Sequence, residues 1–127
     1  MSDEAKKKLV ETYVQAYNRF DVEGMLSVLH DLVVFENISG GEMTLEIKGI
    51  EAFRNQAEQA AKIFNERTQK IEDFVFSDDG CEVNIDYRGI IAVDLPNGLK
   101  AGDEIKLKGK SVFRFADGKI SKIQDIS

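Results

Sequence analysis

Residues 104–115 read EIKLKGKSVFRF, and charged positions alternate with uncharged ones along almost the whole segment. A period of two with one charged face is typical of a strand in an antiparallel sheet that is wet on one side and buried on the other. Two positions on the buried face are not apolar. Gly109 marks a place where a long strand bends or another group approaches closely, and Ser111 puts a hydroxyl where a hydrocarbon is expected. We therefore expect this strand to form the curved floor of a cavity.

The bulk composition describes one folded domain spanning residues 1–127, of which 43% are hydrophobic. The net charge of -6 works against binding to nucleic acid or to membrane surfaces, and we expect the short lysine run at 6–8 to be solvated. A single cysteine, Cys81, excludes an internal disulfide and a multi-cysteine metal site. No apolar run has the length of a leader or a membrane span, so we expect a cytoplasmic protein.

The order of elements follows from hydrophobic spacing and turn residues. Apolar residues at helical spacing predict helices at 3–20, 22–29 and 50–65. Alternating residues predict short strands at 32–38 and 43–48, then longer ones at 68–77, 81–94, 104–115 and 119–126. Twelve residues span about 40 Å at about 3.3 Å each, too far to stay flat over a small core. With Gly89 and Gly109 in mid-strand, we predict an α+β cone in which a long N-terminal helix and two shorter helices pack on a strongly curved antiparallel sheet.

Five segments carry a resemblance to a known family: 13–20, 21–25, 31–37, 48–53 and 112–120. In their order and spacing the chain resembles the NTF2-like (cystatin-like) superfamily, which includes nuclear transport factor 2, SnoaL-like polyketide cyclases and ketosteroid isomerase. The resemblance implies the cone fold with an interior pocket. It does not decide the activity, because this fold hosts isomerases, cyclases, dehydratases, hydrolases and non-catalytic domains.

Ketosteroid isomerase chemistry needs a carboxylate base and hydroxyl donors that hold an enolate. The resemblance places the family's first-helix tyrosine at Tyr13, its base at Asn37 and its second oxyanion donor at Ser111. An amide cannot take up a proton at neutral pH, and a serine hydroxyl is a weaker donor than a carboxylic acid. This isomerase activity is therefore disfavoured, and whether the protein is an enzyme stays open. Glu36 is adjacent, but strand alternation sends it to the opposite face, where we expect a surface residue.

Two further reactive side chains are predicted to be structural. His30 falls at the end of the second predicted helix, where a histidine commonly contacts free carbonyls, and it lacks the orienting partner that a catalytic base requires. Cys81 begins a strand and is expected to be a buried, unreactive thiol. We predict no metal and no cofactor.

What remains is a set of polar tips within an apolar lining, which is the composition of a small-molecule pocket. The predicted ligand-binding residues are Tyr13, Tyr17, Phe35, Asn37, Phe53, Tyr87, Ser111 and Phe113. The alternative is that the polar groups satisfy one another in a filled core. Asn37 and Ser111 favour a pocket because both fall in mid-strand on an otherwise apolar face. Tyr13 and Asn37 are the candidate catalytic residues and would orient a carbonyl.

Two functions remain open. The first is a SnoaL-like protein that binds a small, mostly apolar molecule, with or without cofactor-free proton transfer or cyclisation. The second is a non-catalytic interaction domain that acts through its sheet. Ile90, Ala92 and Val112 fall on the outward parity of their strands, which predicts an apolar patch for homodimerisation.

Overall fold

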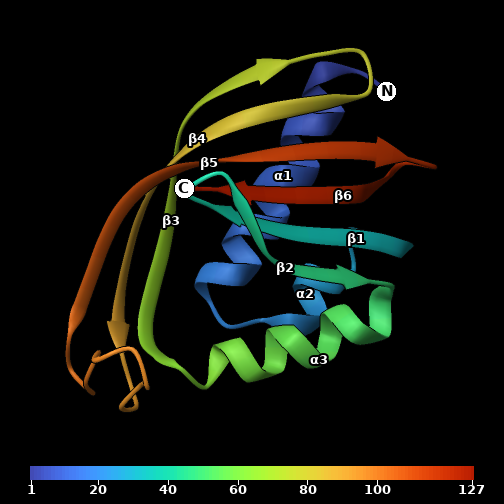
Figure 1. The fold of residues 1–127 in the computed structure, drawn as a ribbon. Coiled ribbons are helices and arrows are strands. Elements are labelled where there is room, and N and C mark those ends of the chain that lie inside the picture. Colours follow the sequence, from blue (N-terminus) through green and yellow to red (C-terminus); the bar gives the residue numbers. More distant parts are fainter.

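The computed structural model describes all residues 1–127 as three helices packed on a six-stranded, strongly curved sheet (Figure 1). The helices are α1 (Asp3–Asn18), α2 (Val22–Leu26) and α3 (Ile50–Ala61). The strands are β1 (Leu29–Ser39), β2 (Glu42–Lys48), β3 (Phe64–Phe76), β4 (Gly80–Ile91), β5 (Glu104–Ala116) and β6 (Lys119–Ile126). The predicted fold class is confirmed.

The sheet is mixed, whereas the sequence predicts an antiparallel one. Its strand order is β2-β1-β6-β5-β4-β3, and only β1 and β6 pair in parallel. β6 pairs with β5 as an antiparallel hairpin partner and also lies beside β1, which runs in the same direction. The first and last strands of the chain therefore meet in the middle of the sheet.

All three helices end earlier than predicted, because their last predicted turns belong to turns and strands. Ser2 caps the start of α1, because its side chain accepts a hydrogen bond from the Ala5 N–H at 3.1 Å. The helix ends two residues before Phe20, which adopts a left-handed φ of 60°. Phe64, placed in a helix by its spacing, instead opens β3. None of the helices is both long and apolar enough to cross a membrane.

The long strands β3, β4 and β5 bend together and wrap over the helices (Figure 1). The two mid-strand glycines lie where other groups come close. A Cβ at Gly89 would lie 2.9 Å from the Phe64 ring, and one at Gly109 would lie 2.7 Å from the Ile126 carbonyl oxygen. Any side chain at these positions would collide with the neighbouring strand or ring, as expected for glycines that permit close approach.

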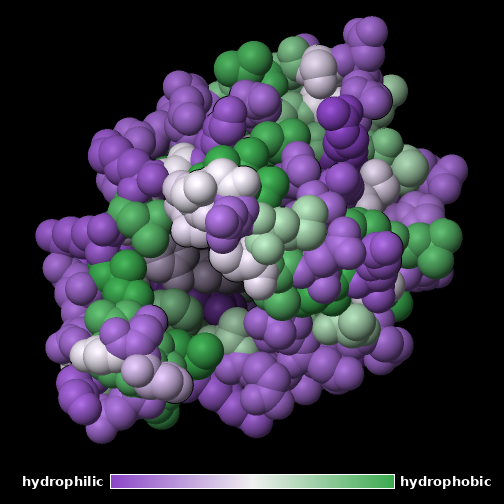
Figure 2. Space-filling view, viewed as in Figure 1, coloured by the Kyte–Doolittle hydropathy of each residue, from purple (hydrophilic) through white to green (hydrophobic).

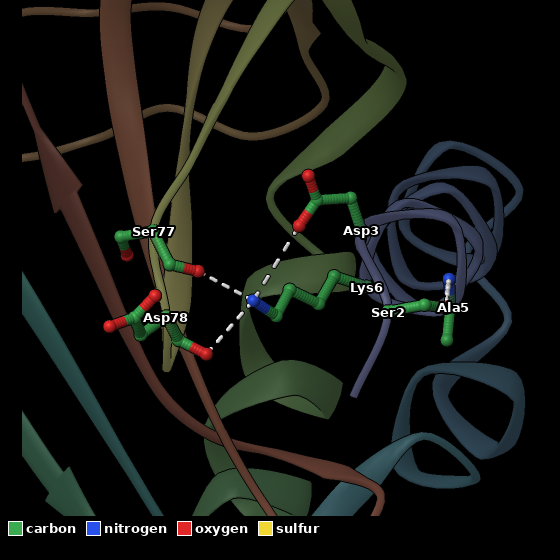
Figure 3. Close-up of polar contacts among 6 residues, drawn as sticks. All are labelled: Ser2, Asp3, Ala5, Lys6, Ser77 and Asp78. Atoms are coloured by element: carbon green, nitrogen blue, oxygen red, sulfur yellow. Dashed lines mark hydrogen bonds and ion pairs between the residues drawn. The ribbon is translucent and has the colours of Figure 1, made fainter.

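The start of α1 is tied to the β3–β4 turn by a lysine that the sequence predicts to be solvated. Lys6 is only 2% exposed. Its Nζ donates to the carbonyl oxygens of Ser77 at 2.5 Å and Asp78 at 3.0 Å, and lies 3.8 Å from a carboxylate oxygen of Asp3 (Figure 3). The prediction for Lys6 is wrong because the turn brings free carbonyls within reach of its long side chain.

The predicted apolar patch on the outer face of the sheet does not form one surface. Ile90, Ala92 and Val112 are each half-buried. Val112 lies between Glu82 and Gln124 in the register, whereas Ile90 lies several rungs away beside Glu104. Homodimerisation stays a prediction, without a continuous apolar face to support it.

Candidate functional site

Two pockets that share three lining residues lie between the concave face of the sheet and the helices, and because of these shared walls we treat them as two lobes of one cavity. The sheet lobe, about 270 Å³, is bounded mainly by β3–β6 and includes Phe64, Tyr87 and Ser111. The helix lobe, about 200 Å³, is bounded by α1, α3, β1 and β2 and includes Tyr13, Phe35, Phe53 and Arg67. Tyr17, Asn37 and Asp125 border both lobes. Each lobe alone is smaller than the about 300 Å³ usual for ligand pockets, and only together do they exceed it.

The surface of the molecule is hollowed on the side viewed in Figure 1. Figure 2 shows the hollow between the bent arms of β3–β5 and the C-terminus, with neutral and hydrophilic atoms in its depth and hydrophobic ones along the part of its rim next to β3–β5. Its place agrees with the sheet lobe, which is lined by β5 residues such as Ile105 and Leu107 and by the terminal Ser127. An apolar rim with a polar base suits a mostly apolar molecule that buries a polar end.

Asp125 on β6 is the carboxylate of this site, and the sequence analysis missed it. In the register of the sheet it lies between Asn37 on β1 and Ser111 on β5, so the three side chains point into the same hollow. The Ser111 Oγ donates to Asp125 Oδ1 at 2.7 Å. Burial raises the pKa of Asp125 to about 6, and the hydrogen bond from Ser111 opposes this only in part. Asp125 keeps some contact with solvent because it borders both lobes.

Ser111 and Asn37, the two strand positions suggested by the resemblance, hydrogen-bond to Asp125 and to a residue of β2. The Ser111 hydroxyl, predicted to donate to an oxyanion, instead donates its hydrogen bond to Asp125. The Asn37 Nδ2 donates to Thr44 Oγ1 at 2.8 Å on the adjacent strand. Both residues border the cavity as expected, but the Ser111 hydroxyl and one of the two Asn37 amide N–H groups are already engaged within the protein.

The three tyrosines contribute neutral hydroxyls to the cavity. Tyr13 is 4% exposed, and its hydroxyl has no hydrogen-bond partner in the chain although it borders the helix lobe. Tyr17 and Tyr87 hydrogen-bond to each other through their hydroxyls at 2.9 Å. Burial is the main cause that raises the pKa of all three, most clearly for Tyr13 and Tyr87. These groups can therefore donate hydrogen bonds at neutral pH and cannot act as bases.

Phe35 and Phe53 border the helix lobe, where their rings meet edge to face at 6.0 Å, and their contact with a ligand stays a prediction. Phe113, also predicted to contact a ligand, borders neither lobe. It is 1% exposed and packs behind Tyr13, with ring centroids 6.0 Å apart. The inward face of β5 at this point meets α1 directly, which leaves no space for a ligand.

Arg67 is a second charged residue of the cavity that the sequence analysis missed. It is 3% exposed, its Nε donates to the Tyr17 carbonyl oxygen at 2.9 Å, and its guanidinium lies 3.7 Å from the centre of the Tyr17 ring. No carboxylate pairs with it, and its Nη2 is buried without a partner. It escaped notice because it falls at the junction between a predicted helix and a predicted strand, where no face is assigned.

The other candidate side chains lie outside the cavity. Glu36 is on the opposite face as predicted, but it is 6% exposed and not a surface residue. The Gln124 Nε2 donates to it at 2.7 Å and, as the largest cause, lowers its pKa. Long side chains on β6, including Lys122 at 3.5 Å, cover it.

His30 lies in β1 and not at a helix end. Its Nδ1 accepts from the Leu32 N–H at 3.0 Å, so its Nε2 carries the proton and donates to Asp117 Oδ2 at 3.0 Å. The predicted contact with helix carbonyls is wrong, and so is the expectation that His30 lacks an orienting partner, because Asp117 accepts its Nε2–H. His30 borders neither lobe, and its structural role stays a prediction. Cys81 is 2% exposed and burial raises the pKa of its thiol to about 11, as expected for an unreactive cysteine.

The profile of the SnoaL-like domain matches residues 10–123. The chain belongs to the SnoaL-like domain family. The resemblance to the NTF2-like superfamily, of which this family is part, is thereby confirmed. Among curated proteins, no sequence matches the chain significantly.

Solved structures agree on the fold of this SnoaL-like domain. AclR, a proposed hydroxylase from Streptomyces galilaeus, is 18% identical with a TM-score of 0.77 over 98% of this chain and 89% of its own. A proposed polyketide cyclase from Xanthomonas campestris pv. campestris is 20% identical, with a TM-score of 0.79 over 98% and 90%. TerC, co-crystallized with polyporic acid, is 17% identical, with a TM-score of 0.76 over 96% and 90%. Such low identities show the fold alone, so the reaction has to be argued from the site.

Proposed function

We propose that this SnoaL-like domain binds a small, mostly apolar carbonyl compound in its two-lobed cavity and transfers a proton within it, without a cofactor. The single observation that carries the proposal is Asp125, a carboxylate inside the cavity whose pKa is raised to about 6. A base works best when its pKa lies near the working pH. At neutral pH Asp125 is mostly ionised, yet it holds a proton more strongly than an exposed carboxylate.

The proposed step uses groups on two sides of the cavity. Asp125 takes a proton from the carbon beside a carbonyl, and the C–H electron pair moves into the carbonyl to give an enolate. The free hydroxyl of Tyr13 donates to the enolate oxygen. Ser111 holds one oxygen of Asp125, and the other has no partner within the chain. Asn37 borders the reacting centre and closes it towards β2.

The enolate then has two outcomes. In isomerisation, Asp125 returns the proton to a different carbon. In cyclisation, the enolate carbon attacks a second carbonyl of the same molecule, and the new alkoxide takes the proton from Asp125. Cyclisation is supported by the family and by the relative described as a proposed polyketide cyclase. A carbon between two carbonyls, as in polyketides, is acidic enough for a carboxylate base.

Proton exchange tests the proposal without knowledge of the natural substrate. Wild-type protein and Asp125→Asn, Tyr13→Phe and Asn37→Ala variants are incubated in D₂O with a panel of simple ketones and β-diketones, and NMR follows loss of the α-proton. Loss of the base should slow exchange by about 10²–10⁴-fold, and loss of the Tyr13 hydroxyl by up to about 10²–10³-fold. Asn37→Ala should have a smaller effect.

A matched control is Asp31→Asn, because Asp31 is exposed and lies outside the cavity. Exchange by the wild type should rise with pH below about 6, following ionisation of Asp125, and level off above it. Equal exchange in all variants would end the enzymatic proposal. It would leave the non-catalytic interaction domain, whose own test is whether gel filtration at high concentration shows a dimer.

A further inference from the structure

Arg67 is a buried arginine whose positive charge has no carboxylate partner in the chain. A guanidinium has five N–H donors, and in Arg67 only the Nε–H has an acceptor, the carbonyl oxygen of Tyr17. No aspartate or glutamate forms an ion pair with it, and its Nη2 is fully buried. The residue borders the helix lobe, so a ligand in that lobe would lie next to a guanidinium whose donors are not all used within the chain.

Local contacts compensate this charge only in part. The Tyr17 carbonyl belongs to the last turn of α1, where the negative end of the helix dipole favours a cation. The rings of Tyr17 and Phe20 lie 3.7 and 4.5 Å from the guanidinium carbon and add cation–π attraction. None of these contacts accepts a hydrogen bond from Nη1 or Nη2. A buried charge with unmet donors is costly to keep unless something else meets them.

We propose that Arg67 selects the ligand: the molecule that enters this cavity carries an anionic oxygen, either a carboxylate or an ionised enol or phenol, which the free donors of Arg67 bind in the helix lobe. The inference rests on the proposed function for the existence of a ligand and adds its chemical class. Arg67 is a specificity-determining residue here, separate from the proton transfer at Asp125.

The positions of the two charges support this arrangement. Asp125 borders both lobes, whereas Arg67 borders the helix lobe and not the sheet lobe. An anion placed beside Arg67 is paired with a cation, which offsets the repulsion that Asp125 would exert on it. The apolar part of the same molecule would extend past Asp125 into the sheet lobe. The ligand would thus be held by its charged end with a neutral carbon at the base.

A pair of planar probes isolates the charge. Lawsone is a hydroxynaphthoquinone that is ionised at neutral pH, and its methyl ether has nearly the same shape without the charge. Calorimetry should show the wild type binding lawsone about tenfold or more tightly than the ether, as expected for a charged hydrogen bond. In Arg67→Gln this preference should disappear. Naphthoic acid, measured alongside, distinguishes a carboxylate-selective site from an enolate-selective one.

Two controls separate ligand selection from a structural role. Arg88→Gln removes an arginine that lies half-exposed beside Glu104, outside the cavity, and it should leave the preference unchanged. The visible absorption of lawsone gives its pKa when bound, which wild type should lower and Arg67→Gln should not. A merely structural Arg67 would change thermal stability without moving this pKa.

The possible results distinguish a failure of the inference from a failure of the proposed function. An unchanged preference for lawsone in Arg67→Gln, or equal binding of lawsone, naphthoic acid and the ether by the wild type, overturns the inference. Asp125-dependent exchange of neutral ketones would still support the proposed function in that case. Absence of binding by every probe overturns the inference, and absence of exchange as well overturns both.

Discussion

Replacing Asp125 with asparagine should stabilise the protein at neutral pH and leave its stability unchanged in acid. The folded protein holds the Asp125 proton more strongly than the unfolded chain does, because burial raises the pKa from 3.8 to about 6. The folded state therefore binds more protons than the unfolded state within this window. The stability that the neutral carboxyl contributes is fully present below the pKa of the unfolded chain and is lost as the pH rises through the pKa of the folded protein.

The size of the effect follows from the shift. One pKa unit corresponds to about 1.36 kcal/mol, so the shift from 3.8 to about 6 is worth at most about 3 kcal/mol. Asp125 keeps some contact with solvent through the cavity, so about 2 kcal/mol is the more realistic gain. For a domain of this length that gain raises Tm by roughly 6–10 °C. Asparagine has the shape of the neutral acid and can still accept the hydrogen bond from Ser111.

Urea unfolding followed by far-ultraviolet circular dichroism, at pH values from about 4 to about 8, measures the difference between variant and wild type. The free energy of unfolding of the variant should equal that of the wild type near pH 4. The difference should grow in favour of the variant up to the folded-state pKa of Asp125 and stay constant above it. Asp31→Asn makes the same chemical change at an exposed site and should stay within about 0.5 kcal/mol throughout. A pH-independent gap, or a less stable Asp125→Asn at neutral pH, would refute the buried-base argument.

Other perturbations test separate parts of the structure. Lys6→Met should lower the free energy of unfolding by about 1–3 kcal/mol, because it leaves two turn carbonyls without their donor, whereas Lys8→Met at an exposed position should not. Gly109→Ala should cost about 1–3 kcal/mol in urea unfolding, because its Cβ would lie 2.7 Å from the Ile126 carbonyl oxygen. Cys81 should react with a disulfide reagent only as fast as the protein opens, because its thiol is buried.

The spacing of apolar residues predicted the helices and strands, because each of them buries a single face. The strand at β5 has one charged face and one buried face, and its boundaries, predicted as 104–115, agree with Glu104–Ala116 to one residue. Helix ends were predicted less well, since Phe64 continues the helical spacing of α3 but is drawn into β3, where its ring covers Gly89. The parallel pairing of β1 with β6 could not be predicted from spacing, because alternation has the same period in either direction.

Most of the predicted pocket residues border the cavity because they lie on inward faces that periodicity identifies. The two charged residues escaped for different reasons. Arg67 falls between the predicted helix at 50–65 and the predicted strand at 68–77, so no inward face was assigned to it, whereas β3 in fact begins at Phe64 and places Arg67 opposite the buried Gly89. Asp125 lies on β6, where isoleucines at 120, 123 and 126 disguise the alternation. The register between β5 and β6 shifts at Arg114 and Phe115, and this irregularity breaks the pattern.

The strand register explains why Asn37, Asp125 and Ser111 lie together. One rung of the sheet is apolar from β1 to β4, and its members are Phe35, Ile123, Phe113 and Cys81. The inward rung beside it, two residues further along β1, carries Asn37, Asp125 and Ser111. β6 lies between β1 and β5 in the sheet, so the residue of β6 on this rung, Asp125, has a polar neighbour on each side. A buried carboxylate that receives only one hydrogen bond lowers stability at neutral pH, and its placement at a cavity between two polar neighbours supports the proposed role of Asp125 as a base.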